Sequence, residues 1–151
     1  MGLKFKLDPK AKIKISASCG GSEPCKAGCS THPRTKDGMR LITIAFDVDG
    51  TLRNNTDDTM VANERIRSLL VALSSFKNVK IVVWSGGGEL YARQAARAMH
   101  VDQYVDEYAS KNFVRKDGLK PIFEPDIKPD IAIDDIHDCE LGIINLIVKE
   151  K

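Results

Sequence analysis

Long apolar runs are missing from this 151-residue sequence, and it has few prolines and aromatic residues. No apolar run approaches the roughly 18 residues that a membrane-spanning helix needs, so no membrane association is expected. The apolar residues near Lys4 and Lys6 alternate with charge, unlike the apolar region of a secretory signal. With 42% hydrophobic and 29% charged residues, the chain is not of the disordered class either. We therefore expect a cytoplasmic globular protein.

Charge is unevenly distributed along the chain. Residues 1–40 hold 9 Lys/Arg against 3 Asp/Glu, whereas residues 41–151 hold 14 against 18. This difference predicts a basic, cysteine-rich extension over 1–40 and a separate acidic domain over 41–151. A basic arm can follow the phosphates of a nucleic acid or of a phosphorylated partner. It can equally be a solvated terminal extension.

Three of the four cysteines lie in this extension. Cys19, Cys25, Cys29 and His32 have the spacing C-x5-C-x3-C-x2-H, which offers four ligands to a small zinc site. Zinc could organise a loop that is this poor in apolar residues. Free thiols in a flexible arm are the alternative, and disulfides are not expected in a reducing compartment.

Apolar strands and amphipathic helices alternate from residue 41 onward. This pattern predicts a doubly wound, mainly parallel α/β sheet of five strands, with helices on both faces and no cap domain. The strands are expected at residues 41–46, 80–84, 104–109, 131–133 and 143–148, and the helices at 60–76 and from about Glu89. Alternation at residues 3–7 and 13–15 predicts one or two further short strands in the extension.

Polar residues follow three of these predicted strands. Asp47, Ser85 and the pair Asp134-Asp135 each come where a strand ends. In open α/β sheets, ligands bind beyond the carboxyl ends of the strands. We therefore expect these side chains to converge on one site.

Carboxylates in this arrangement suit phosphate monoester hydrolysis. Asp47 can attack phosphorus to give an acyl phosphate, and Asp49, two residues further on, can act as general acid and then as base. Gly50 allows a sharp turn, and Thr51 is expected to hold Asp49 by a hydrogen bond and to contribute to substrate binding. A magnesium ion would offset the charge repulsion. Its expected ligands are Asp47, Asp49, Asp134 and Asp135.

The turn after the second strand is a candidate phosphate cradle. Ser85 supplies a hydroxyl group, and Gly86 and Gly87 supply backbone N–H groups at the start of a helix. A lysine should neutralise the remaining phosphoryl charge. Four lysines lie between the predicted third and fourth strands: Lys111, Lys116, Lys120 and Lys128. We favour Lys111, because it directly follows the predicted third strand.

These motifs resemble the haloacid dehalogenase superfamily of phosphohydrolases over residues 41–148. The resemblance rests on Asp47-Val48-Asp49-Gly50-Thr51-Leu52, on the strand ending in Ser85, and on Ile131-Ala132-Ile133 followed by Asp134-Asp135. It implies a nucleophilic Asp47, an acid/base Asp49, a phosphate-binding Ser85, a lysine before the acidic pair, and magnesium. Neither gap between motifs has room for a cap domain, as in the capless subgroup. A shorter likeness points to the 3′-phosphatase domain of phage polynucleotide kinase.

Two functions follow from these expectations. The first is a phosphatase acting on a phosphorylated substrate. Members of the capless subgroup often act on a macromolecule, such as a nucleic acid or a phosphoprotein. Others close the active site by forming a homo-oligomer. The second is a nucleic-acid or phosphoprotein binding module with a vestigial phosphatase site. Turnover of a phosphate ester, abolished by Asp47→Asn, separates the two.

Overall fold

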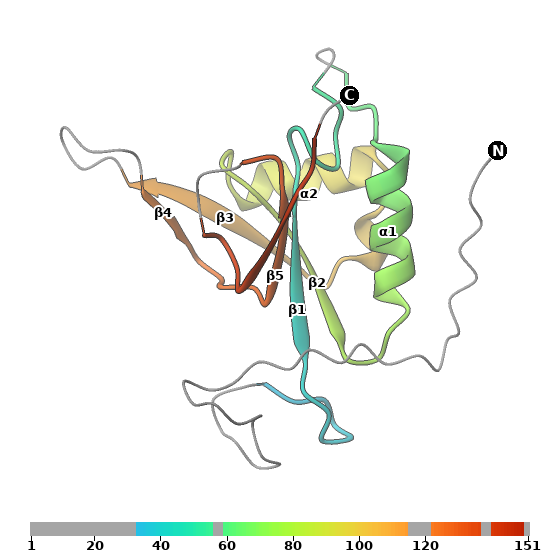
Figure 1. Cartoon of the computed structure of the whole chain (residues 1–151). Helices are drawn as coiled ribbons and strands as arrows, with labels where there is room; N and C mark the ends of the chain where they lie inside the picture. Colours follow the sequence, from blue (N-terminus) through green and yellow to red (C-terminus); the bar gives the residue numbers. More distant parts are fainter. Residues whose placement is uncertain (1–32, 56–58, 115–121, 137–139, 150–151) are drawn as a thin grey trace.

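The computed structural model describes residues 33–55, 59–114, 122–136 and 140–149 (Figure 1). They form two helices, α1 (Glu64–Ser74) and α2 (Glu89–Ala98), and a 3-10 turn, η1 (Asp102–Tyr104). Six strands complete the domain: β1 (Ile42–Asp47), β2 (Val79–Ser85), β3 (Glu107–Val114), β4 (Ile122–Pro125), β5 (Ile131–Asp134) and β6 (Ile144–Ile147). The strands predicted at residues 3–7 and 13–15 lie outside the described residues.

The strands form one mixed, mainly parallel sheet in the order β4-β3-β2-β1-β5-β6. The described part of the chain thus contains six strands where five were predicted. The sixth is β4, which pairs antiparallel with β3 from Lys111↔Pro125 to Val114↔Ile122. Four residues ending in proline make a weak local signal, so pairing with β3 is what defines this edge strand. The third strand also begins later than predicted, because Asp102–Tyr104 form a 3-10 turn.

Both helices pack on the same face of the sheet, so the prediction of helices on both faces is wrong. Leu70 of α1 and Ala92 of α2 belong to one buried cluster with Ile44 and Ile81. The crossovers β1-α1-β2 and β2-α2-β3 step in the same direction across the sheet. Right-handed crossovers that step in one direction place their helices on one side. Sequence periodicity contains no information on that direction.

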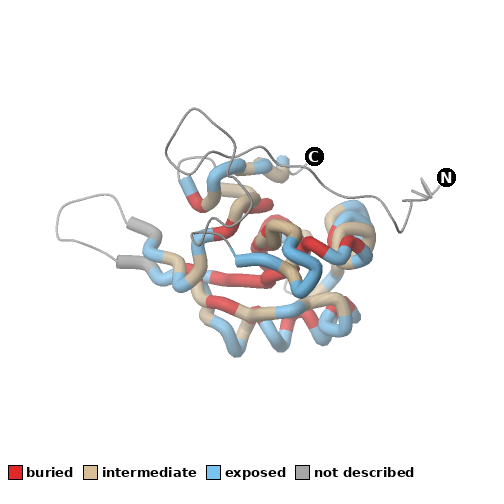
Figure 2. The backbone as a smooth tube through the Cα atoms, turned by 90° about the horizontal axis from the view of Figure 1, so that it is seen from below, coloured by how far each residue is buried: buried red, intermediate tan, exposed pale blue. Residues whose placement is uncertain are grey.

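Within the described residues, no helix covers the opposite face. A second buried cluster lies there, formed by short and aromatic side chains of the central strands, including Ala45, Trp84 and Ala132. Leu141, from the connection before β6, completes the cluster, and Ile127, from the connection before β5, packs against it. Figure 2 shows the buried residues gathered toward the interior of the domain, with exposed residues around them. On this face, residues from the connections before β5 and β6 therefore take the place that helices were expected to have.

Strand β1 lies between β2 and β5, and this position determines where a ligand can bind (Figure 1). The chain leaves β1 toward β2 and β3, and later returns to the other side of β1 as β5 and β6. A crevice at the carboxyl end is expected where the strand order reverses in this way. Over the described residues, no helix has the length and apolar character to cross a membrane.

Candidate active site

Strand register brings the candidate residues to one face and one edge of the sheet. Ala45, Ala109 and Ala132 belong to the cluster on the helix-free face. Side chains two residues apart along a strand share a face. Asp47, Lys111 and Asp134 each stand two residues beyond one of these alanines, so three strands direct them to the same place.

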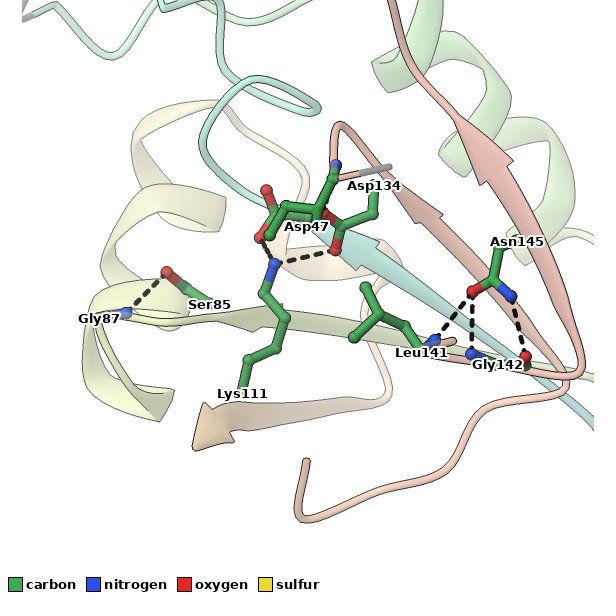
Figure 3. A network of polar contacts seen from close by, with 9 residues as sticks. Asp47, Ser85, Gly87, Lys111, Asp134, Leu141, Gly142 and Asn145 are labelled. Carbon is green, nitrogen blue, oxygen red and sulfur yellow. Dashed lines mark hydrogen bonds and ion pairs between the residues drawn. The ribbon is translucent and has the colours of Figure 1, made fainter. Parts of the chain in front are cut away.

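The carboxylates of Asp47, Asp134 and Asp135 form a cluster at this edge. One oxygen of each lies within 4.8 Å of the others, so this trio could hold a metal ion. Lys111 Nζ is 2.5 Å from Asp47 Oδ1 and 2.8 Å from Asp134 Oδ2 (Figure 3). Asp47, Lys111 and Asp134 are each at most 4% exposed. The sheet therefore holds three acidic groups and one ammonium group in a largely buried cluster.

Negative charge is in excess in this cluster. Burial raises the pKa of Asp47 to about 7, although Lys111 acts in the opposite direction. Burial, and then the charge of Asp134, raise the pKa of Asp135 as well. Burial by itself lowers the pKa of Lys111, but Asp47 and Asp134 outweigh it and raise that pKa. With all groups ionised, three carboxylates against one ammonium leave two negative charges, which one divalent cation would balance.

The turn after β1 brings the backbone close to Asp135. Gly50 has a φ of +77°, and a Cβ atom added to it would lie 2.3 Å from Asp135 Oδ2 and 2.9 Å from Asn55 Nδ2. Backbone N–H groups of Leu52 and Arg53 donate to the carbonyl oxygens of Asp47 and Val48, which tightens the turn. Glycine is required here both by the left-handed backbone and by the space that the Asp135 carboxylate occupies.

Asp49 lies outside the carboxylate cluster. Its side chain is 42% exposed, and its Oδ1 accepts hydrogen bonds from Arg53 Nη1 at 2.7 Å and from Tyr91 Oη at 2.8 Å. Burial, and then the bond to Asp49, raise the pKa of Tyr91, so the phenol remains a donor. Among the described residues, the acidic groups that come together are thus Asp47, Asp134 and Asp135, without Asp49.

Thr51 does not hold Asp49, so that expected hydrogen bond is wrong. The Thr51 side chain is fully buried, and its Oγ1 is a buried polar atom without a hydrogen-bond partner. The turn directs Thr51 into the interior together with Val48 and Leu52, which are also fully buried. Asp49 remains on the solvent side, where Arg53 and Tyr91 are its partners.

The turn after β2 lies next to the carboxylate cluster. Asp47 is in register with Trp84, so Ser85 lies one residue further along the neighbouring strand. The Gly87 N–H donates to Ser85 Oγ at 3.0 Å, as Figure 3 shows, and Gly86 and Gly87 are exposed. Helix α2 begins one residue after Gly88, which has a φ of +93°. These groups lie at the helix N-terminus, where backbone N–H groups favour an anion.

The four candidate lysines are placed very differently. Lys111 lies in the cluster, and the Lys128 side chain is exposed. Lys116 and Lys120 lie outside the described residues, as do Cys19, Cys25, Cys29 and His32 of the predicted zinc site.

Three residues that sequence reasoning had not assigned to the site lie around it. Arg53 follows Asp49 by four positions, a spacing at which the two side chains can meet in a turn. Trp84 is fully buried, with its ring centroid 5.8 Å from Lys111 Nζ. Tyr91 is 42 residues from its partner Asp49, so only the fold reveals that contact.

The cluster fits a hard divalent cation. Its donors are carboxylate oxygens from two strand ends, and magnesium prefers oxygen ligands of this kind. The two uncompensated negative charges favour a cation, and the carboxylates of Asp134 and Asp135 add to the burial that raises the pKa of Asp47. The chain matches no protein-family model, no curated protein sequence and no solved structure.

Proposed function

We propose that this chain is a magnesium-dependent phosphohydrolase that cleaves phosphate monoesters through an aspartyl phosphate on Asp47. One observation carries the proposal: Lys111 pairs with both Asp47 and Asp134 at the carboxyl edge, beside Asp135. The resemblance to the haloacid dehalogenase superfamily adds the roles of nucleophile, acid/base and metal ligands. The sheet order, with β1 at the reversal point, is compatible with that resemblance.

Each step of the reaction has a residue in the described site. Lys111 orients the Asp47 carboxylate through Oδ1, and an Asp47 oxygen attacks phosphorus while the bond to the leaving oxygen breaks. Asp49 gives its proton to that oxygen. Water then attacks the acyl phosphate and gives a proton to Asp49, which releases inorganic phosphate and restores Asp47.

Phosphate binding falls to the turn after β2 and to Lys111. The Ser85 hydroxyl and the exposed backbone of Gly86 offer donors at the start of α2, and the Gly87 N–H, which donates to Ser85 Oγ, would orient that hydroxyl or turn to the phosphate when it binds. Asp47, Asp134 and Asp135 would hold the magnesium ion, which when bound offsets the repulsion between Asp47 and the phosphoryl group. Pre-positioned charges of this kind supply much of the catalysis in phosphoryl transfer.

The test is hydrolysis of para-nitrophenyl phosphate with and without Mg²⁺. We expect turnover that requires the metal and is abolished by Asp47→Asn, whereas Asp102→Asn, at an exposed aspartate of η1, retains it. A quenched reaction should contain phosphorylated protein, and hydroxylamine should release its phosphate and leave a hydroxamate on Asp47, as expected of an acyl phosphate. Absence of turnover with every phosphate ester, together with salt-dependent nucleic-acid binding that Asp47→Asn leaves intact, would instead support the binding module.

A further inference from the structure

Asp49 is held by two donors on a single oxygen atom. Tyr91 Oη donates to Asp49 Oδ1 at 2.8 Å, and Arg53 Nη1 donates to the same atom at 2.7 Å. Arg53 Nη1 also lies 3.4 Å from Tyr91 Oη. Three side chains from a turn and from a helix thus form one small network. Its centre is the carboxyl group to which the proposed mechanism assigns proton transfer.

Tyr91 is itself firmly placed between Asp49 and the phosphate-binding turn. A Cβ atom on Gly87 would lie only 3.0 Å from ring atom Cδ1 of Tyr91, so the ring packs directly on this turn. Tyr91 also packs against the main core cluster, to which Ala92, Ala95 and Ala96 anchor α2. The phenol therefore connects the Ser85–Gly88 turn to Asp49 at a set separation.

The network is compatible with both protonation states of Asp49. A carboxylate accepts hydrogen bonds on either oxygen, and a neutral carboxyl group still accepts them on its carbonyl oxygen. If Oδ1 accepts both hydrogen bonds throughout, Oδ2 can be protonated and deprotonated without any rearrangement of the Asp49 side chain. The two donors would then hold the acid and the base in one orientation.

We propose that Tyr91 and Arg53 are positioning residues that hold Asp49 through Oδ1 and present Oδ2 for proton transfer. This inference rests on the proposed function. In the first step the proton on Oδ2 moves to the leaving oxygen as its bond to phosphorus breaks. In the second step Oδ2 takes a proton from the water that attacks the acyl phosphate.

Leaving-group dependence tests this role, because a basic leaving oxygen needs the proton and an acidic one does not. Phenyl phosphate and 2,4-dinitrophenyl phosphate supply the two cases. The ratio kcat/KM covers the steps up to departure of the leaving group, so the later hydrolytic step does not enter. Tyr91→Phe removes the hydroxyl group and keeps the ring against Gly87, and Arg53→Lys keeps the charge while removing the planar guanidinium.

For each variant we expect kcat/KM to fall about tenfold or more with phenyl phosphate and by less than about twofold with 2,4-dinitrophenyl phosphate. Tyr108→Phe is the matched control, since this tyrosine is also half-buried and its ring contacts Arg93 rather than Asp49. It should change neither value. In an Asp49→Asn background, Tyr91→Phe should cause no further loss, because both changes remove the same function.

Equal losses with both esters would overturn the inference, since they would place Tyr91 in phosphate binding or in the fold alone. Unchanged rates in both variants, or full additivity with Asp49→Asn, would overturn it as well. Thermal unfolding identifies a variant that does not fold, and the other variant then decides. A wild-type chain that hydrolyses neither ester defeats the proposed function itself, whereas an active wild type with unaffected variants defeats only the positioning role.

Discussion

Gly50→Ala is expected to remove Asp135 from the carboxylate cluster. The new Cβ atom would lie 2.3 Å from Asp135 Oδ2 and 2.7 Å from its Cγ. Carbon and oxygen atoms that are not bonded stay more than 3 Å apart, so the carboxyl group has to move by about 1 Å. Magnesium tolerates little deviation from octahedral geometry at about 2.0–2.1 Å from each oxygen. A displacement of that size therefore breaks the contact between Asp135 and the ion.

Two effects contribute to this variant and can be separated. Alanine at a φ of +77° costs about 1–2 kcal/mol of folding free energy, apart from any contact. Gly38 has nearly the same φ, +76°, and a Cβ atom added there meets nothing within 4 Å. Gly38→Ala is thus a control with the backbone strain and without the collision. In the absence of metal, Gly50→Ala should lose at least as much stability as Gly38→Ala, because it adds the collision to the same backbone strain. Only Gly50→Ala should lose at least about tenfold in Mg²⁺ affinity, which corresponds to about 1.4 kcal/mol.

Calorimetric titration with Mg²⁺ measures the affinity, and urea unfolding measures the stability. The chain has a single tryptophan, Trp84, whose ring lies near Lys111 Nζ, so its fluorescence offers a second reading of the same titration. Equal Mg²⁺ affinities for Gly50→Ala and Gly38→Ala would refute the reasoning. Asp135 would then not be a ligand, or the turn would differ from the one described.

Three further predictions concern the charges and the buried polar groups of the site. Lys111→Met should lower the free energy of unfolding by about 3–5 kcal/mol at a pH well above 7, where Asp47 is ionised. The loss should be smaller at a pH below 7, because Asp47, whose pKa rises further without Lys111, then takes up a proton. Urea unfolding at the two pH values measures this, with the exposed Lys128→Met as control. Mg²⁺ should raise the unfolding temperature more above that pKa than below it, since protons compete for Asp47; an equal rise at both pH values would contradict this. Thr51→Val should stabilise the fold by about 1 kcal/mol, because its buried Oγ1 has no partner, and a clear loss of stability in urea would show that the hydroxyl is satisfied.

The linkage behind the first two of these predictions has a definite sign. Burial raises the pKa of Asp47 from 3.8 to about 7 in the folded chain, so ionising Asp47 destabilises the fold. The metal-free protein therefore loses stability as the pH rises through this interval. Removing the Lys111 ammonium group enlarges that loss, and binding a divalent cation reverses it.

Local sequence signals account for most of the elements. The β-branched run before Asp47 predicted β1 to within a residue at each end, and Gly86 to Gly88 predicted the start of α2 at Glu89. Leu70 and the neighbouring apolar positions at helical spacing predicted α1, although the helix begins at Glu64 and not at Met60. These elements depend on periodicity and on turn residues, both of which a single sequence contains.

Long-range packing accounts for what was missed. Strand β4 is defined by its pairing with β3. Helices α1 and α2 lie on the same face of the sheet because both crossovers step in the same direction. The burial of the Thr51 side chain and the hydrogen bond between Asp49 and Tyr91 both depend on how the turn after β1 packs. None of these contacts leaves a signal at short sequence separation.

The sequence by itself determined that acidic residues stand at the ends of two apolar strands, because strand ends follow from local burial patterns. Only the tertiary structure decided that β1 and β5 are neighbours, which brings Asp47 and Asp134 to the same Lys111 ammonium group. Strand order depends on which apolar surfaces bury one another across the whole chain. The sequence of any one segment does not show which other segment it will pack against.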